Sequence, residues 1–319
     1  MVDQLQKFIF DAAPVRGEIV SLENTWQEVL TRRAYPAAVQ SLLGEMMAAA
    51  ALLSANLKFD GSLIMQIHGD GPVQMLVVQC DSALSMRATA KLADRDVPIA
   101  ADATLSQLLN PHGGARFAIT LDPRERGPGA QPYQGVVSLE DDNGPIESMA
   151  KVLEHYMQHS EQLDTRIWLA ADEKHAVGML LQKLPRDGGI MPHRGDADAD
   201  TWDRVGHLAS TLTASEMLAA DADTLLRRLF WQENVRRFEP LRARFQCTCS
   251  RAKVGAMLQM LGSSETDEIL NEQGRIEIHC EFCNQRYAFD PVDVAQLFAG
   301  DGSALPPSAR IAPPGVQRH

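Results

Sequence analysis

Four of the five cysteines in this 319-residue chain fall into two tight pairs near its C-terminal end. One residue separates Cys247 from Cys249 in "FQCTCSR", and two residues separate Cys280 from Cys283 in "HCEFCNQ". Zinc prefers four tetrahedral ligands, and thiolates in two close pairs are a common structural set. The spacing therefore predicts that these four cysteines bind one zinc ion.

The segment around these cysteines, 244–298, is about as small as a domain with an apolar core alone can be. Structural zinc contributes about 10–16 kcal/mol to the folding of small peptides, whereas the net stability of a domain is only about 5–15 kcal/mol. We therefore expect this segment to unfold without its metal. Thiolates are the reactive form of cysteine, and each pair holds its own resolving thiol. Oxidation is expected to form Cys247–Cys249 and Cys280–Cys283 disulfides and to release zinc.

Composition excludes some classes of function. The chain has 30 Lys and Arg residues against 42 Asp and Glu residues, a formal net charge of −12, so it is a poor candidate for binding phosphate backbones. The longest apolar run, "MMAAAALL" at 46–53, is shorter than the roughly 20 residues that span a bilayer. The charged N-terminus is not a signal peptide. We expect a cytoplasmic protein without nucleic-acid or membrane partners, where close cysteine pairs are more often metal ligands or redox thiols than permanent disulfides.

Residues 1–185 are expected to form an α+β domain with a mixed or antiparallel sheet and packed helices. "PAAVQSLLGEMMAAAALLSANL" is rich in good helix formers and has Pro36 near its first turn. "SLIMQIHGDGPVQMLVVQC" is two apolar runs around Asp70-Gly71, which favours a tight hairpin. Further short apolar runs follow as consecutive hairpins, so we expect one sheet with helices on one face.

Residues 186–243 are predicted to form a helical linker. Gly, Pro and Asp are concentrated at 185–200, which marks a domain boundary. Short helices follow, with Ser215 and either Asp221 or Asp223 as possible N-caps. Helices this short are marginal without a packing partner, so the linker should depend on docking against the first domain. While the linker is docked, its large apolar side chains are expected to pack on the first domain; they are Trp202, Leu208, Leu212, Met217, Leu218, Leu225, Leu226, Leu229, Phe230 and Trp231.

The zinc-binding domain, 244–298, is expected to contain two helices, a hairpin and a last helix. Ser250 is a possible N-cap of the first helix, and Gly262 and Gly274 follow the two helices. "RIEIHCEFCNQRYAFD" alternates like a hairpin, with Cys280 and Cys283 at its turn. The Pro-rich tail at 299–319 is expected to be disordered.

Two other signals carry no catalytic prediction. His155 and His159 lie four residues apart on one helix face, with Glu154 and Glu161 nearby, but the Glu is not placed as a metalloprotease requires. A solvated helix face is the better interpretation. Cys80, in "VQMLVVQC", is expected to be a small core hydrophobe. Since no nucleophile and base are paired, we do not expect an enzyme.

The cysteine pattern, together with "HGDGPVQMLVVQCD" and "SEQLDTRIWLAA", resembles the heat shock protein 33 family, the bacterial redox-regulated holdase chaperones. The resemblance covers roughly residues 5–295. The Pro-rich tail and "GPGAQP" at 127–132 do not match the family and carry no inference.

The resemblance implies a reduced, zinc-bound and inactive state, with Cys247, Cys249, Cys280 and Cys283 as both ligands and switch. Oxidation with mild unfolding stress releases zinc and unfolds the C-terminal segment and the linker. The exposed apolar surface then binds unfolded client proteins without ATP and prevents their aggregation. The active form is implied to be a homodimer.

Two other functions stay open at this point. A zinc-ribbon adaptor could bind nucleic acid, although residues 240–319 contain 8 Lys and Arg against 9 Asp and Glu and so have no basic excess. A thiol–disulfide oxidoreductase could use "CEFC" as its exchange pair, although that motif normally opens a helix after a strand. Salt-dependent nucleic-acid binding would support the first, and disulfide-exchange turnover the second.

Overall fold

The computed structural model describes residues 3–11, 13–57, 60–93, 98–125, 131–142, 144–184 and 197–299. The chain divides into two compact units. The first comprises residues 1–247 with 281–283, and the second comprises 248–280 with 284–319. The start of the predicted linker, 186–196, and the predicted tail beyond Ala299 lie outside the described residues.

The first unit contains a six-stranded antiparallel sheet of order β10-β11-β2-β1-β12, in which β13 also pairs with β1. Consecutive hairpins form its centre, because β1–β2 and β10–β11 are each joined by a short turn. The strands are β1 (Gln4–Phe10), β2 (Val15–Leu22), β10 (Thr165–Ala171), β11 (Ala176–Lys183), β12 (Val235–Arg237) and β13 (Leu241–Arg242).

A second six-stranded sheet, of order β14-β5-β4-β3-β6-β7, completes the strands of the core. The Gly69 N–H donates to the Gln74 carbonyl at 2.9 Å, and the predicted hairpin at Asp70-Gly71 joins β3 to β4. The strands are β3 (Gly61–His68), β4 (Val73–Asp81), β5 (Ser85–Leu92), β6 (Arg116–Pro123), β7 (Tyr133–Val137) and β14 (Arg244–Phe245), with a separate pair β8 (Glu140–Asp141) and β9 (Gly144–Pro145).

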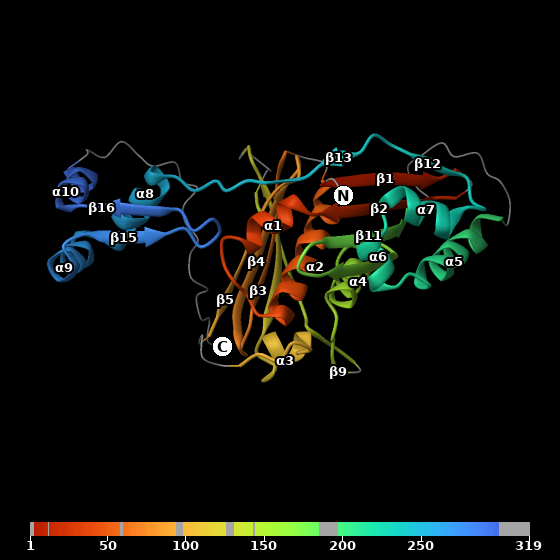
Figure 1. Ribbon diagram of the computed structural model, residues 1–319, viewed down its shortest axis with the longest axis horizontal. Coiled ribbons are helices and arrows are strands. Elements are labelled where there is room, and N and C mark those ends of the chain that lie inside the picture. Colours follow the sequence, from red (N-terminus) through yellow and green to blue (C-terminus); the bar gives the residue numbers. More distant parts are fainter. Residues whose placement is uncertain are drawn as a thin grey trace. The chain divides into compact units, whose positions relative to one another are not determined.

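Helix α2 (Ala37–Ser54) packs against strands of both sheets and forms the centre of the core (Figure 1). Its apolar side chains are buried almost all round, and a Cβ at Gly178 of β11 would lie 2.9 Å from Leu52 Cδ1. The α+β class is confirmed, but the expected single sheet is replaced by two, because a helix that is apolar on every side needs cover on every side. Among the described residues, α2 alone is long and apolar enough to cross a membrane; its burial is that of a core helix.

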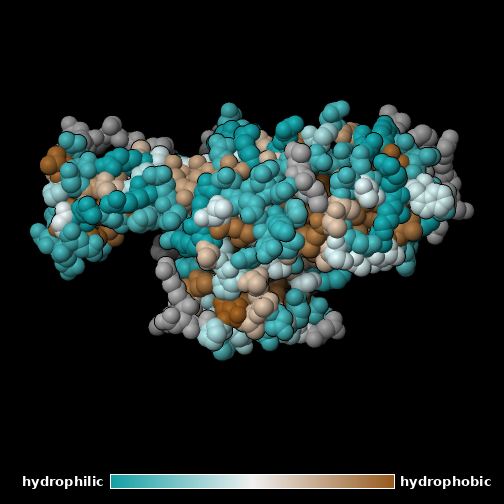
Figure 2. Space-filling model, viewed as in Figure 1, coloured by the Kyte–Doolittle hydropathy of each residue, from teal (hydrophilic) through white to brown (hydrophobic). Residues whose placement is uncertain are grey.

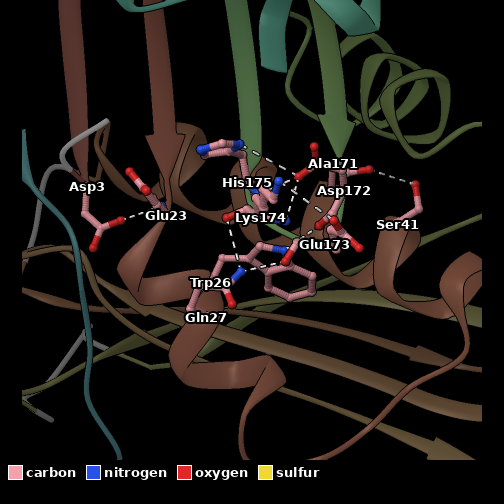
Figure 3. A network of polar contacts seen from close by, with 10 residues as sticks. All are labelled: Asp3, Glu23, Trp26, Gln27, Ser41, Ala171, Asp172, Glu173, Lys174 and His175. Carbon is pink, nitrogen blue, oxygen red and sulfur yellow. Dashed lines mark hydrogen bonds and ion pairs between the residues drawn. The ribbon is translucent and has the colours of Figure 1, made fainter. Parts of the chain in front are cut away.

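The turn between β10 and β11 is held against α1 (Asn24–Leu30) and α2 by a network of hydrogen bonds (Figure 3). Trp26 Nε1 donates to the Asp172 carbonyl at 2.8 Å, and the Asp172 carboxylate accepts the His175 N–H at 2.6 Å. The Ser41 hydroxyl of α2 lies 3.5 Å from the Ala171 carbonyl and donates to it. These bonds fix one end of β10. The remaining helices of the core are α3 (Leu105–Leu109) and α4 (Met149–His159).

Helices of the predicted linker pack on the face of the first sheet opposite α2 (Figure 1). They are α5 (Ala197–Ser210), α6 (Ala214–Ala219) and α7 (Ala222–Phe230). Phe230 is 2% exposed, and its ring centroid lies 5.1 Å from that of Phe10. With the apolar sides of these helices turned inward, the face in view in Figure 2 is largely hydrophilic over this unit.

Two details of the linker differ from the sequence prediction. Trp231 was expected to pack against the core, but it is 73% exposed because α7 has ended and its side chain follows the helix C-terminus. Thr213, rather than Ser215, caps α6, and forms a capping box in which Glu216 closes back on the Thr213 N–H. Asp221 caps α7 as predicted, accepting the Thr224 N–H at 2.7 Å.

Beyond Trp231 the chain is extended rather than helical. Strands β12 and β13 pair with the free edge of β1, and β14 pairs in parallel with β5. Pro240 cannot supply a helical N–H, and the outer strands of both sheets offer backbone partners to an extended chain. This segment therefore adds β12 and β13 to the first sheet and β14 to the second.

The second unit is small and has the elements that the sequence predicts. Ser250 caps α8, and Gly262 and Gly274 follow α8 and α9 with φ of +100° and +74°. Arg251 lies over the Phe289 ring, 4.2 Å from its centroid, and ties α8 to the hairpin. The elements are α8 (Arg251–Leu261), α9 (Ser263–Gln273), β15 (Ile276–His279), β16 (Arg286–Phe289) and α10 (Pro291–Ala299).

Candidate metal centre

The structure brings all four C-terminal cysteines together. The Sγ atoms of Cys247, Cys249, Cys280 and Cys283 all lie within 4.8 Å of one another. Each of the four residues is half-buried. Among the described residues, no other group of three or more His, Cys, Asp and Glu side chains is close enough to hold a metal ion.

The hairpin of β15 and β16 positions one pair. The Cys280 N–H donates to the Gln285 carbonyl at 2.9 Å, and the Asn284 N–H donates to the Cys280 carbonyl at 2.8 Å. Asn284 has a φ of +58°, a left-handed conformation that Asn tolerates better than most residues. The tight turn brings Cys283 back beside Cys280, as two-residue spacing at a hairpin turn requires.

The start of α8 positions the other pair. Ser250 caps this helix by accepting the Lys253 N–H at 3.2 Å, and Cys249 comes directly before the cap. In an extended segment, residues two apart point to the same side. The single residue between Cys247 and Cys249 therefore allows both sulfurs to face one ion, although this spacing is tighter than the usual two.

Two hydrogen-bond donors contact the sulfurs. Within the second unit, the Tyr287 hydroxyl donates to Cys249 Sγ at 3.1 Å. Within the first unit, Arg87 Nη1 of β5 lies 3.6 Å from Cys247 Sγ and donates to it. Donors of this kind orient metal ligands. Sequence reasoning missed both residues, since a Tyr in an alternating strand and an Arg 160 positions away carry no local signal for the site.

The donor set fits a soft metal ion. Four thiolates select zinc, copper(I) or iron–sulfur chemistry over hard cations such as magnesium or calcium. In a tetrahedral site with metal–sulfur bonds of 2.3 Å, the sulfurs lie about 3.8 Å apart. The observed spacing, at most 4.8 Å, requires only a small contraction. The four cysteines could therefore hold a metal ion.

Cys80 lies apart from this cluster. It is 1% exposed in β4, and burial raises the pKa of its thiol to about 12. A thiol that remains protonated at neutral pH is a poor nucleophile and a poor ligand. The prediction that Cys80 is a small core hydrophobe is confirmed.

The two histidines of α4 are also placed as a surface feature. The rings of His155 and His159 stack with centroids 4.0 Å apart. Their acidic neighbours have other partners: Glu154 accepts the Ile167 N–H at 2.8 Å, and Glu161 accepts the Tyr156 hydroxyl at 2.8 Å. The neighbouring carboxylates are therefore engaged in holding α4 and its C-terminal turn, as expected for a helix face without a catalytic role.

An α+β core unit, a small second unit and a cluster of four cysteines that could hold a metal ion together define the class of protein to which this chain belongs. A family model described as Hsp33 protein matches residues 3–290. The chain belongs to the Hsp33 family.

Similar proteins support this assignment over nearly the whole chain. A 33 kDa chaperonin of Chromobacterium violaceum is 48% identical over 309 residues, covering 97% of this chain and 98% of the relative. A 33 kDa chaperonin of Azotobacter vinelandii is 46% identical over 311 residues, with the same coverage. The crystal structure of the 33 kDa chaperonin of Thermotoga maritima has the same fold, with a TM-score of 0.74 at 22% identity, over 92% of this chain and 97% of that one.

Proposed function

We propose that this protein is a redox-regulated, ATP-independent holdase chaperone. The observation that carries the proposal is the convergence of four half-buried thiols, two of them, Cys249 and Cys280, from a unit whose own apolar core is very small. Membership of the Hsp33 family and the name of its relatives, 33 kDa chaperonin, support the chaperone part. The reduced, metal-bound form is the inactive state, and loss of the metal begins activation.

The proposed ligands are Cys247, Cys249, Cys280 and Cys283, and the proposed cofactor is one zinc ion. Zinc needs no further ligand in a four-thiolate site and has no redox chemistry of its own. When bound, it supplies structural cross-linking rather than catalysis. The buried apolar residues of the second unit are few, so the ion has a large share in its stability. They are Leu258, Ile276, Phe289 and Val294.

Oxidation is the proposed trigger. Peroxide oxidises one thiolate of a pair to a sulfenic acid, and the neighbouring thiolate displaces hydroxide to form the disulfide. Each pair thus loses two electrons to one peroxide molecule, which is reduced to two molecules of water after protonation. The proposed disulfides are Cys247–Cys249 and Cys280–Cys283. Neither disulfide can serve as a thiolate ligand set, so zinc leaves.

Release of the linker is the proposed output. Helices α6 and α7 have 6 and 9 residues and lie well below the length at which isolated helices are stable. Their apolar sides pack on the first sheet, with Leu225, Leu229 and Phe230 buried. Once undocked, these side chains and the sheet face beneath them become surface that binds unfolded proteins. We further propose that the active form is a homodimer, that the protein acts in the cytoplasm, and that it is not an enzyme.

A client aggregation assay tests the proposal. Chemically denatured citrate synthase is diluted into buffer with the full-length protein, either reduced or treated with peroxide at elevated temperature, and zinc release is followed in the same samples with a chromogenic chelator. We expect suppression of light scattering only after treatment, in step with the release of one zinc per chain. Suppression by the reduced, zinc-loaded protein, or zinc release without suppression, contradicts the proposal.

Neither alternative function gains support from the site. The "CEFC" segment follows β15 and precedes β16, rather than opening a helix as in thiol–disulfide oxidoreductases. Phosphate-backbone binding requires a basic surface, and the second unit has no basic excess. Disulfide-exchange turnover or salt-dependent nucleic-acid binding by the reduced protein would reverse this ranking.

A further inference from the structure

Strand β10 is an outer strand of the first sheet, and its backbone faces β11 on one side only. At its two ends, the Lys183 N–H donates to the Asp164 carbonyl at 2.9 Å and the Asp172 N–H donates to the His175 carbonyl at 2.9 Å. Hydrogen-bonded pairs alternate along an antiparallel ladder. The even-numbered residues of β10 therefore bond to β11, and the odd-numbered residues direct their N–H and C=O groups outward.

Two of these outward groups have partners from helices. The Glu154 carboxylate of α4 accepts the Ile167 N–H at 2.8 Å. At the end of the strand, the Ser41 hydroxyl donates to the Ala171 carbonyl (Figure 3). Between them, the N–H and C=O of Leu169 have no hydrogen-bond partner in the part of the chain that the structure describes. Glu154 thus occupies the place that the carbonyl of a neighbouring strand would take.

A cavity of about 660 Å³ runs beside this edge. Ile167 and Leu169 line it from the strand, α2 and α4 line it from the core side, and α5 and α6 line it from the linker side. Helix α5 approaches very closely here, since a Cβ at Gly206 would lie 1.5 Å from Arg166 Nη1. The linker helices therefore form one wall of a space that opens when they undock.

The two basic side chains around the cavity are paired with carboxylates, and burial raises the pKa of a third lining group, the Glu45 carboxyl of α2, to about 7. Lys151 Nζ lies 2.6 Å from a Glu154 carboxylate oxygen, and Arg166 lies 3.4 Å from Asp203 and over the Trp202 ring. Since Lys151 and Arg166 are already paired, the site has no unpaired basic group to select an anion. Its distinctive chemistry is a row of backbone donors and acceptors at two-residue spacing beside apolar side chains. An extended polypeptide with apolar side chains is complementary to that row.

We propose that the outer edge of β10 binds an extended apolar segment of an unfolded client protein as an added strand. The segment bonds to the outward groups of Ile167 and Leu169, displaces the Glu154 carboxylate from the Ile167 N–H, and lies where α5 and α6 close the cavity. This inference rests on the proposed holdase function and names the kind of contact by which a client is held. It also explains how one site accepts many sequences, because backbone groups are common to all of them.

Amide hydrogen exchange tests the contact directly in the unmodified protein. The probe is reduced, carboxymethylated α-lactalbumin, a permanently unfolded chain, added to oxidised full-length protein. We expect exchange of the Leu169 amide to slow at least tenfold on binding, with no comparable change at Trp168, whose N–H already bonds to β11. Binding with unchanged exchange at Leu169 overturns this inference and leaves the proposed function intact. Absence of any binding by the oxidised protein overturns both.

A pair of substitutions supplies a second test. Leu169→Pro removes the outward N–H but no bond to β11, and proline is tolerated on edge strands. Leu169→Ala shortens the same side chain and keeps the N–H. We expect Leu169→Pro, after oxidation, to bind a fluorescent, apolar ten-residue peptide about tenfold more weakly than Leu169→Ala, measured by anisotropy. Equal affinities overturn the inference; if the proline variant does not fold, the exchange result decides.

Substitution of Glu154 should strengthen peptide binding, whereas Leu169→Pro should weaken it. Glu154→Ala leaves the Ile167 N–H free for a client, whereas Glu154→Gln keeps an acceptor in the same place. We expect the alanine variant to bind the peptide about threefold more tightly than the glutamine variant. Equal or weaker binding contradicts displacement of Glu154. If Leu169→Pro instead abolishes self-association without client in analytical ultracentrifugation, and peptide affinity is unaffected, the edge binds a second copy of this chain and the client inference is overturned.

Discussion

The two compact units of this protein are stabilised by different physical means. In the first, α2 is surrounded by two sheets, and the resulting core contains dozens of buried apolar side chains. In the second, two helices, a hairpin and a last helix share a core of four buried residues. Burial is worth about 25 cal/mol per Å² of apolar surface, so we expect the first unit to be stable through its core and the second to depend on a cross-link such as four thiolates on one ion. The difference in core size teaches that one chain can contain a fold with a large apolar core beside one that has little apolar core of its own.

Removal of the metal should produce the largest difference in stability between the two units. Structural zinc is worth about 10–16 kcal/mol in small folded peptides, more than the net stability of most domains. We expect a strong chelator, or Cys280→Ser, to unfold the second unit and leave the strands of the core folded. Hydrogen exchange resolved by peptide measures this, with Cys80→Ser as the control for loss of a thiol outside the cluster. Retained protection of β15 and β16 in metal-free protein contradicts the comparison.

The linker should be the weakest part of the first unit. Phe230→Ala removes a ring that is 2% exposed and packed against Phe8 and Phe10, and such truncations cost about 3–5 kcal/mol. We expect α7 to exchange its amides faster and apolar dye to bind the reduced protein. Trp231→Ala is the matched control, because Trp231 is 73% exposed and should change stability by less than about 0.5 kcal/mol. Similar effects of the two substitutions contradict the docked arrangement of α7.

A buried carboxyl makes the stability of the core depend on pH. Glu18 of β2 is 1% exposed, and burial raises its pKa to about 7 despite Lys7 opposite and Arg16 on its own strand, while one of its oxygens lacks a hydrogen bond. The folded state therefore binds this proton more tightly than the unfolded state, whose ordinary carboxyl pKa is near 4.5. Stability contributed by the protonated form is full below pH 4.5 and is lost as pH rises through 7.

Glu18→Gln should remove that dependence. We expect the variant to raise the free energy of unfolding of the first unit by about 3 kcal/mol at pH 8 and by almost nothing at pH 4. Urea unfolding followed by Trp fluorescence measures both. Glu28→Gln, on the exposed face of α1, is the control and should show no such pH dependence. An equal change in the free energy of unfolding at both pH values would mean that the charge of Glu18 does not destabilise the first unit.

The smallest expected effect on stability concerns the N-cap of α6, for which Thr213 and Ser215 are the two candidates. Thr213 accepts the Glu216 N–H and caps α6, whereas Ser215 lies inside the first turn. Loss of an N-cap costs about 1 kcal/mol. We expect Thr213→Ala to destabilise α6 by that amount in hydrogen exchange, and Ser215→Ala to have little effect. The reverse order would favour the cap that the sequence alone predicts.

Much of the local structure follows from short sequence signals. Asp70-Gly71 marks the turn between β3 and β4, Ser250 and Gly262 mark the ends of α8, and the alternation around Cys280 marks the hairpin. These signals work because each acts within a few residues. The predicted cap at Ser215 was wrong. Thr213 and Glu216 form a capping box instead, and the sequence does not say at which residue α6 begins.

The sequence predicted the four cysteines of the candidate site, but it did not predict the side chains that contact them. Scarce cysteines in two pairs are enough to propose a four-thiolate site, because the ligand types and spacings are local. The contacts of Tyr287 with Cys249 and of Glu154 with Ile167 join residues that no spacing relates. Long-range partners of this kind come from packing alone.

By itself, the sequence determined which residues can hold a metal, which segments form hairpins, and which short helices need a partner, since these depend on residue type and near neighbours. Only the tertiary structure decided that α2 lies between two sheets, that the chain after Trp231 adds strands β12, β13 and β14, and that β10 has a neighbouring strand on one side only among the described residues. The physical reason is that a buried surface or a strand edge is satisfied by whichever segment reaches it, however distant in the chain.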